Sequence, residues 1–456
     1  MSALAAEVAA IDLGDRRLNR RARNVLEKLG DRPTVSIPTA CRGWDETRGA
    51  YRLFDHEEVT AQQVLAPHYG ASQRRMAEYP RVLCIQDTTE LDCGDKGDIE
   101  GLGPLNYEAR QGVYLHPTLA VTPERLCLGV IDAWTWTREP GSLSESKCDR
   151  RPIEEKESLR WLEGYRRVCE RQAELPDTQL IYLADREADS YEIFAERDAQ
   201  TPAAEYLIRG QHDRKLSNAK TLRQALDEAP ELDRIEFDMP KTKQRKAQRI
   251  TQSLRAVRVT LKAPLRSGHT LPDVEVTALL AQELNPPAGA EPIEWLLLTS
   301  LVVDTAEQAV EMLQCYLCRW QVEIYFRILK SGCKVEELQL EKRSRLEPAL
   351  AFYMIIAWRV LYLTMLGREC PELPCNLVFA DEEWQAVCIV AKRKPPPQTP
   401  PSLDQMVRMV AGFGGFLNRK GDGFPGPQTI WIGLQRSRDF VLAVEATRAM
   451  QEPSCG

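Results

Sequence analysis

The sequence predicts an α/β protein built on a mixed β-sheet. Two short apolar runs, RVLCI at 81–85 and QLIYLA at 179–184, have the length and composition of buried strands. Between them, two β-rich runs at 112–121 and 125–137 are joined by TPE, which is the pattern of a β-hairpin. An amphipathic helix predicted at 153–175 separates this hairpin from the second buried strand. Such an order of strands and helices is typical of a sheet with both parallel and antiparallel pairs.

The rest of the chain divides into two helical ends and a β-rich insertion. DREADSYEIFAERD, directly after the second buried strand, is expected to begin a helix, and AEYLIRG at 204–210 is one more strand. Residues 211–300 alternate in strand fashion, so we expect a β-rich insertion there. The predicted organisation is a helical N-terminal domain at 1–75, an α/β domain at 76–369 that contains the insertion, and a helical C-terminal region at 370–456 that includes a proline-rich linker at 394–402.

Composition indicates a globular protein of a reducing compartment. The 456 residues are 43% hydrophobic and 28% charged, and thirteen cysteines lack the spacing of a disulfide scaffold. The N-terminus lacks the basic-then-apolar order of a signal peptide. The apolar run at 349–366 could mimic a membrane span, but Arg359 at its middle is costly in a bilayer. We therefore expect a core helix there, a cytoplasmic protein and no membrane partner.

Zinc and histidine-based chemistry are not expected. Cys315 and Cys318 form a CxxC pair inside a predicted helix, without a second CxxC or a His-x3–5-His pattern. The five histidines are not paired at ligand spacing.

Charge is distributed unevenly along the chain. The net charge is −7 and the pI about 5.6, which would argue against a nucleic-acid partner. Yet five arginines lie within 16–23, and 241–262 holds eight basic residues and no acidic one, with smaller clusters at 342–345 and 392–394. Separate basic strips on an acidic body suit a protein that grips a polyanion, although each strip could also be a solvated loop.

A predicted helix at 316–332 carries an unusual polar stripe. At about 100° per residue, Tyr316, Arg319, Glu323 and Lys330 fall within roughly 60° of one another, and apolar side chains cover most of the remaining surface. A helix that is apolar nearly all round is normally buried, so the stripe would line a polar cleft. The alternative is an i,i+4 ion pair between Arg319 and Glu323 on a wet face.

Two aspartates directly follow the buried strands. Asp87 and Asp185 stand at the carboxyl ends of these strands, where ligands gather in open α/β sheets. Each alone could be an ordinary strand-end or helix N-cap residue. Together with Glu323 they form an all-oxygen ligand set that suits Mg²⁺ or Mn²⁺. Two such ions clamp the attacking and leaving oxygens of a phosphoryl transfer, so the basic strips and the carboxylates together indicate phosphodiester chemistry.

The stripe also carries a resemblance to a known family. Its spacing, Tyr-x2-Arg-x3-Glu-x6-Lys, resembles the YREK signature of the insertion-sequence-four family of cut-and-paste, hairpin-forming transposases. The likeness runs in one order over nearly the whole chain. Five further segments resemble the family: LGDRRLNRRARN with GAYRLFD its DNA-binding domain, IQDTTEL and ADREADSYEI its two aspartate strands, NPPAG with EWLLLTS its β-insertion, and GFGGFLNRKGDG its dimerisation region.

The resemblance implies an RNase H-like catalytic core with a helical DNA-binding domain before it and a helical dimerisation domain after it. Asp87, Asp185 and Glu323 would bind two Mg²⁺ or Mn²⁺ ions per active site. The activities implied are nicking at a transposon end, hairpin formation and opening, and strand transfer. The partners implied are double-stranded DNA, as terminal inverted repeats and target, and a second copy of the chain in a synaptic homodimer.

The resemblance also implies residues that contact DNA. Tyr316, Arg319 and Lys330 would hold the phosphate beside a flipped end base on which Trp295 stacks. Packing roles for Trp295 and Tyr316 remain open. Three more positions match DNA-contact regions of the family: Arg20, Arg52 and Arg209.

The sequence leaves two other functions open. A repressor or inhibitor derived from a transposase would bind DNA without cutting it, although such a binder has no need of three metal carboxylates. A different RNase H-like nuclease or resolvase would cut DNA without joining it.

Overall fold

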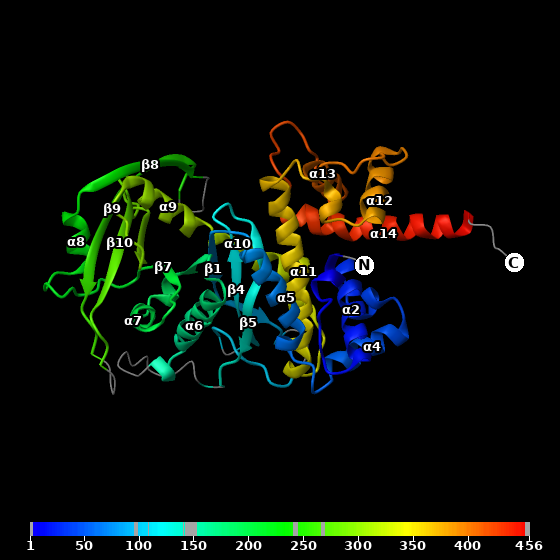
Figure 1. Cartoon of the computed structure of the whole chain (residues 1–456), viewed down its shortest axis with the longest axis horizontal. Helices are drawn as coiled ribbons and strands as arrows, with labels where there is room; N and C mark the ends of the chain where they lie inside the picture. Colours follow the sequence, from blue (N-terminus) through cyan, green and yellow to red (C-terminus); the bar gives the residue numbers. More distant parts are fainter. Residues whose placement is uncertain are drawn as a thin grey trace.

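The computed structural model describes residues 3–94, 99–107, 109–139, 141, 153–239, 245–265 and 270–451. Its core is one eleven-stranded sheet in the order β2-β4-β1-β6-β7-β11-β10-β9-β8, with β3 and β5 both paired to β4 (Figure 1). Strand β6 is parallel to both β1 and β7, and the other strand pairs are antiparallel. This topology confirms the predicted mixed sheet. The strands are β1 (Arg81–Gln86), β2 (Thr89–Asp92), β3 (Gly103–Pro104), β4 (Gln111–Val121), β5 (Cys127–Trp136), β6 (Gln179–Ala184), β7 (Glu205–Arg209), β8 (Glu231–Met239), β9 (Gln248–Leu261), β10 (Val274–Glu283) and β11 (Glu294–Thr299).

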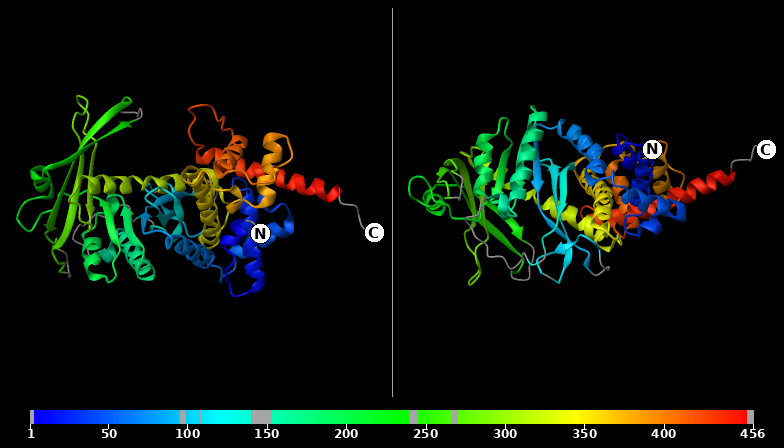
Figure 2. Two further views of the ribbon diagram at one scale, coloured as in Figure 1. Left: turned by 45° about the horizontal axis from the view of Figure 1, so that its top comes forward. Right: turned by 90° about the horizontal axis from the view of Figure 1, so that it is seen from below.

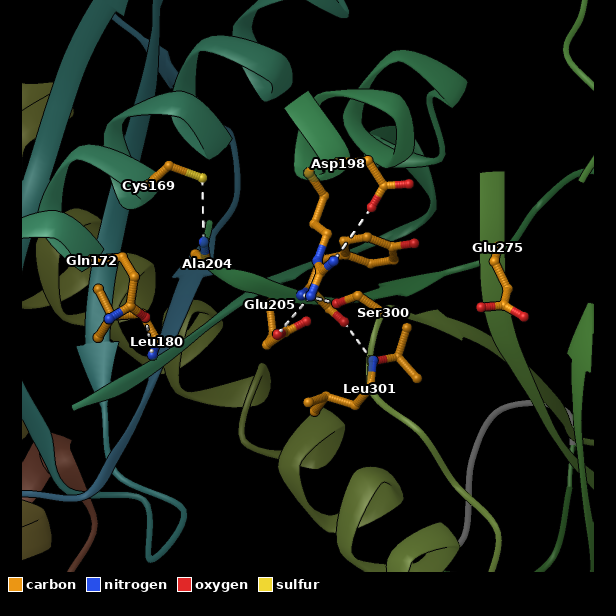
Figure 3. A network of polar contacts seen from close by, with 12 residues as sticks. Cys169, Gln172, Leu180, Asp198, Ala204, Glu205, Glu275, Ser300 and Leu301 are labelled. Carbon is orange, nitrogen blue, oxygen red and sulfur yellow. Dashed lines mark hydrogen bonds and ion pairs between the residues drawn. The ribbon is translucent and has the colours of Figure 1, made fainter. Parts of the chain in front are cut away.

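The β-rich insertion extends the central sheet. Strand β11 pairs antiparallel with β7, with Leu298 opposite Ile208, and β10, β9 and β8 follow outward. Helix α9 then leads from the insertion back to α10, as Figure 2 shows. A hydrogen bond strengthens this junction, since Ser300 Oγ accepts from the Tyr206 amide at 3.0 Å. Figure 3 also shows a bond from α6 to the residue before β7, in which Cys169 Sγ accepts from the Ala204 amide at 3.4 Å. The insertion was expected to interrupt the α/β domain, but it continues the same sheet.

The helices agree with the sequence in type but differ in extent. The helix predicted at 153–175 is a 3-10 turn, η3 (Ile153–Glu155), followed by α6, which begins at Leu159. The helices are α1 (Ala3–Glu7), α2 (Arg16–Asp31), α3 (Ile37–Cys41), α4 (Trp44–Phe54), α5 (Ala61–Met76), α6 (Leu159–Glu174), α7 (Tyr191–Ala199), α8 (Leu222–Glu228), α9 (Ala306–Leu317), α10 (Trp320–Arg327), α11 (Arg343–Glu369), α12 (Asp381–Lys392), α13 (Leu403–Phe413) and α14 (Pro427–Gln451).

Helix α11 is the central helix of the molecule. Among the described residues it is the one helix long and apolar enough to cross a membrane by length and composition, and 89% of its most apolar window is buried in the fold. Arg359, half-way along it, lies 3.8 Å from the carboxylate of Glu383 on α12. The predicted core helix is therefore confirmed, and the arginine at its middle has an acidic partner.

The two helical ends of the chain lie beside α11, on the side away from the insertion (Figure 1). They also contact each other, since Arg438 of α14 lies 2.9 Å from Asp31 of α2 and the Thr34 hydroxyl donates to Gln435 at 2.6 Å. Helix α5, by contrast, packs against β5 and α11.

We expect Phe352→Ala to lower the free energy of unfolding by about 3–5 kcal/mol. The Phe352 ring on α11 is fully buried and lies 6.0 Å from the ring of Phe54 on α4, so its loss leaves a cavity between the N-terminal helices and the core. Urea denaturation measures the change. Leu377→Ala, at a side chain 64% exposed, is the control, and an equal loss in both variants would contradict the packing role of α11.

Candidate active site

The two aspartates leave the sheet at the same edge. Strands β1 and β6 are neighbours and parallel, with Ile85 opposite Leu183, and each is buried from its second residue to its last. Asp87 follows β1 and Asp185 follows β6, so both carboxyl groups emerge where parallel strands end. The Asp185 side chain also accepts a 2.8 Å hydrogen bond from the Glu187 amide and caps the 3-10 turn η4 (Arg186–Ala188). Asp185 can therefore both cap this turn and belong to the candidate active site.

The helix predicted at 316–332 is divided into three parts. Helix α9 ends at Leu317, α10 runs from Trp320 to Arg327, and a π-helical turn, η5 (Ile328–Gly332), carries Lys330. The expectation of one continuous helix was therefore wrong. A turn at Cys318 and Arg319 separates α9 from α10, and Trp320, on a helix that was expected to be buried nearly all round, is 62% exposed.

Arg319 bridges two of the three acidic residues. Its Nη1 lies 2.7 Å from Oδ2 of Asp87, and its Nη2 lies 2.8 Å from Oε1 of Glu323. The guanidinium is mostly buried, with 18% of the side chain exposed. The i,i+4 ion pair that was considered from the sequence is present, and it extends to an aspartate from another element.

The carboxylates repel one another electrostatically. Burial raises the pKa of Asp87 to about 7, and the negative charges of Asp185 and Glu323 contribute to the rise while Arg319 opposes it. These charge effects on Asp87 indicate that Asp185 and Glu323 lie near it. A cation that binds there would relieve both the repulsion and the desolvation of Asp87.

The fit of the site to a divalent cation depends on Arg319. Within the part of the chain that the structure describes, no three His, Cys, Asp or Glu side chains are placed so that they could hold a metal ion together. The Arg319 guanidinium binds oxygens of Asp87 and Glu323 that a cation would need. The donor chemistry, three carboxylates with excess negative charge, fits Mg²⁺ or Mn²⁺ once Arg319 turns away.

The raised pKa of Asp87 makes the stability of the fold depend on pH. A proton on Asp87 stabilises the fold, and this contribution is complete below the unfolded pKa of about 4 and is lost as the pH rises through about 7. We therefore expect Asp87→Asn to stabilise the metal-free protein by roughly 1–3 kcal/mol more at pH 8.5 than at pH 5. Urea denaturation in EDTA at both pH values tests this. An equal effect at the two pH values would mean that Asp87 is not destabilised by its neighbours.

The predicted DNA-contact residues around the carboxylates also gather. The rings of Trp295, at the start of β11, and Tyr316, at the end of α9, lie 6.3 Å apart. Burial raises the pKa of Tyr316 to about 12, and the charges of Arg319 and Arg209 oppose the rise, so both guanidinium groups lie near the phenol. Lys330 stands at the other end of α10, where its ammonium lies 3.7 Å from Glu336. Four predicted contacts, Trp295, Tyr316, Arg319 and Arg209, thus form one cluster beside the carboxylates.

The remaining basic residues behave differently. Arg20 on α2 and Arg52 on α4 are exposed, and these helices lie on the other side of α11 from the sheet (Figure 1). In the basic run at 241–262, Lys241 and Lys243 lie outside the described residues. Four arginines of the run have partners within the protein: Arg245 with Glu283 at 2.7 Å, Arg249 with Glu236 at 2.7 Å, Arg255 with the Asp227 carbonyl at 2.7 Å, and Arg258 with Glu275 at 3.2 Å. These four arginines of the predicted basic strip are therefore paired within the protein, by groups on β8, β10 and α8.

Two polar residues beside Asp87 were not predicted. Thr88 donates its amide to the Asp87 carboxylate at 2.8 Å, and its hydroxyl is hydrogen-bonded to His116 of β4. The signal that could have revealed them is Pro117, since a proline within a strand lacks the amide needed for regular pairing and often marks an interruption.

Family models match three successive parts of the chain. A transposase DNA-binding model matches residues 1–59, a transposase DDE domain model matches 160–359, and the model of the Tn5 transposase dimerisation domain matches 355–454. The chain is a transposase with a DDE domain. The matched DDE span contains Asp185 and Glu323, whereas Asp87 lies upstream of it.

The three matches account for the order of the helical and α/β parts of this transposase. They support DNA binding at the N-terminus and dimer formation through the C-terminal helices. Among solved structures, the chain is similar to a piggyBac transposase in a synaptic complex with hairpin DNA, at 10% identity over 99% of this chain and 80% of that chain, with a TM-score of 0.36. That likeness is too distant to bear on the geometry of the site.

Proposed function

We propose that this transposase cuts and joins DNA by metal-dependent phosphoryl transfer at Asp87, Asp185 and Glu323. The observation that carries the proposal is geometric: Asp87 and Asp185 follow neighbouring parallel strands, and Arg319 joins Asp87 to Glu323 by hydrogen bonds of 2.7 and 2.8 Å. Such an arrangement is costly for stability alone and is common at catalytic sites. A transposase DDE domain covers two of the three residues.

The carboxylates are proposed to hold two Mg²⁺ or Mn²⁺ ions. When bound, such ions activate the attacking oxygen and stabilise the leaving oxygen of an in-line displacement. Arg319, released from Asp87 and Glu323, turns to a DNA phosphate, which Tyr316 and Lys330 also contact. A guanidinium suits this exchange because carboxylates and phosphates accept the same paired N–H donors.

The proposed reaction follows the cut-and-paste course. Water opens one strand at the transposon end, the freed 3′-hydroxyl attacks the opposite strand to form a hairpin, and water opens the hairpin. The same 3′-hydroxyl then attacks target DNA. Two subunits are proposed to act together in the cytoplasm, with the N-terminal helices reading the terminal inverted repeats through exposed arginines that include Arg20 and Arg52, and with Arg209 near the cleaved end.

Trp295 is proposed to stack with an end base that leaves the duplex during hairpin formation. We expect Trp295→Ala to slow hairpin formation by roughly 5–100-fold, because stacking of one base on an aromatic ring is worth about 1–3 kcal/mol. The first nick needs no such base and should slow much less. Gel analysis of end-labelled DNA separates the two steps, with Trp295→Phe as the control that keeps a ring. Equal loss of both steps, together with a lower melting temperature, would assign Trp295 to packing.

The proposed function is tested with purified protein, Mg²⁺ and DNA that carries the terminal inverted repeats flanking its gene. Nicks, hairpins and strand-transfer products are expected, and EDTA should remove all three. DNA binding without any cleavage by the folded protein would favour a repressor instead, and cleavage without joining would favour a nuclease or resolvase.

A further inference from the structure

We infer that His116 is a positioning residue for Asp87 and acts through Thr88. This inference relies on the proposed role of Asp87 as a metal-binding carboxylate. It adds a residue from the neighbouring strand β4, one that does not touch the carboxylates itself.

Strand register brings the three residues into line. Strand β4 pairs with β1 at Gln86 and Thr118 and with β2 at Thr89 and Leu115. Both pairs follow the same residue-to-residue register along β4. Strands β1 and β2 therefore form one continuous line beside β4, and the line is interrupted only at Asp87 and Thr88. That register sets Asp87 opposite Pro117 and Thr88 opposite His116.

At this interruption the backbone of Asp87 and Thr88 lacks regular strand pairing. Pro117 has no amide hydrogen to donate, so regular pairing is impossible at Asp87, whose own amide makes a long 3.5 Å contact to the Pro117 carbonyl. Because the ladder does not fix this dipeptide, side-chain contacts must do so. The Thr88 hydroxyl is hydrogen-bonded to Nδ1 of His116, and the Thr88 amide donates to Oδ1 of Asp87 at 2.8 Å.

The His116 imidazole is buried among aromatic rings, and its polar contact among the described residues is the one with Thr88. His116 is 1% exposed, and its ring lies 4.7 Å from that of Trp134 and 4.8 Å from that of Trp161. Burial lowers the pKa of His116 to about 3, so the ring is neutral at physiological pH. Within the described residues its Nε2 has no hydrogen-bond partner, and the Thr88 contact is the single polar bond of the ring. A buried nitrogen without a hydrogen-bond partner costs free energy, and an apolar ring in the same place would avoid that cost. A packing role alone therefore does not explain a histidine at this position.

The contact between His116 and Thr88 matters most when Arg319 moves away from Asp87. Arg319 holds Oδ2 of Asp87, and the Thr88 amide holds Oδ1. Once Arg319 turns to DNA, the Thr88 amide is the remaining described bond that orients the Asp87 carboxylate. By fixing the Thr88 hydroxyl, His116 keeps that amide directed at Asp87, as outer-shell partners orient metal ligands elsewhere.

Four single variants separate this role from packing. His116→Asn keeps a polar atom near the Nδ1 position, whereas His116→Gln places it nearer Nε2. Thr88→Ser keeps the hydroxyl, and Thr88→Val removes it at nearly constant volume. For full-length protein we expect His116→Gln and Thr88→Val each to weaken Mn²⁺ binding and slow nicking by about 10–100-fold, and the Asn and Ser variants to restore most of both.

The double variant gives the decisive readout. If His116 acts through Thr88, adding His116→Gln to Thr88→Val changes Mn²⁺ affinity, measured by electron paramagnetic resonance, no further. The inference would be overturned if the losses of Mn²⁺ affinity in His116→Gln and Thr88→Val multiplied in the double variant. It would also be overturned if His116→Asn were as defective as His116→Gln. Wild-type Mn²⁺ affinity and nicking in both His116→Gln and Thr88→Val would overturn it as well. If the wild type binds Mn²⁺ but does not nick, the proposed function fails while the Mn²⁺ cycle still decides the role of His116.

Discussion

Asp185→Asn is expected to slow DNA nicking and strand transfer by roughly 10³–10⁴-fold, because loss of one metal-binding carboxylate removes several kcal/mol of transition-state stabilisation. Asp185 is not fully buried, and the Asn amide oxygen can still accept the 2.8 Å hydrogen bond that caps η4. The fold and the affinity for DNA in EDTA should therefore survive. Quenched-flow analysis of nicking and a strand-transfer gel measure the loss.

The matched control is Asp177→Asn. Asp177 is exposed in the turn before β6, so it lies at the opposite end of the strand that Asp185 follows. This variant should nick like the wild type. Cleavage by Asp185→Asn at a comparable rate would mean that another group performs the chemistry, and loss of DNA binding without metal would mean that Asp185 is structural.

Arg319→Ala is expected to have two opposite effects. Without DNA, Mn²⁺ should bind about tenfold or more tightly at pH 8, because the cation that bridges Asp87 and Glu323 at 2.7 and 2.8 Å is gone. Nicking should nevertheless slow by roughly 10–100-fold, because the variant cannot make the charge-assisted hydrogen bonds to the DNA phosphate. Titration with Mn²⁺ and nicking at saturating Mn²⁺ measure the two effects separately.

Arg319→Lys distinguishes charge from geometry. One ammonium keeps the positive charge but cannot span two carboxylates as a guanidinium does. We expect Mn²⁺ affinity between those of the wild type and Arg319→Ala, and a nicking rate nearer the wild type. Weaker Mn²⁺ binding in Arg319→Ala would show that Arg319 supports the metal site instead of competing for it.

The sequence predicted the parts of the site that depend on local patterns. The apolar runs of β1 and β6 are short and β-rich, and a carboxylate follows each of them, so the positions of Asp87 and Asp185 at strand ends could be predicted from sequence alone. The polar stripe predicted Arg319 beside Glu323, because residues four apart on a helix are neighbours.

Features that depend on distant contacts could not be predicted in this way. The turn at Cys318 and Arg319 contains neither glycine nor proline, so no local signal divides α9 from α10. The pairing of β7 with β11 joins segments far apart in the sequence, and the partners of the β9 arginines come from other elements. His116 reaches Asp87 only through the register of β4, which no periodicity in the sequence reveals.

The measurement that tests the central claim most directly is anomalous X-ray diffraction from crystals of the full-length protein with Mn²⁺ and a duplex that carries its terminal repeat. We predict anomalous peaks among the carboxylates of Asp87, Asp185 and Glu323, with Arg319 turned to a DNA phosphate. Arg319 still bridging Asp87 and Glu323, with manganese bound elsewhere, would contradict the claim.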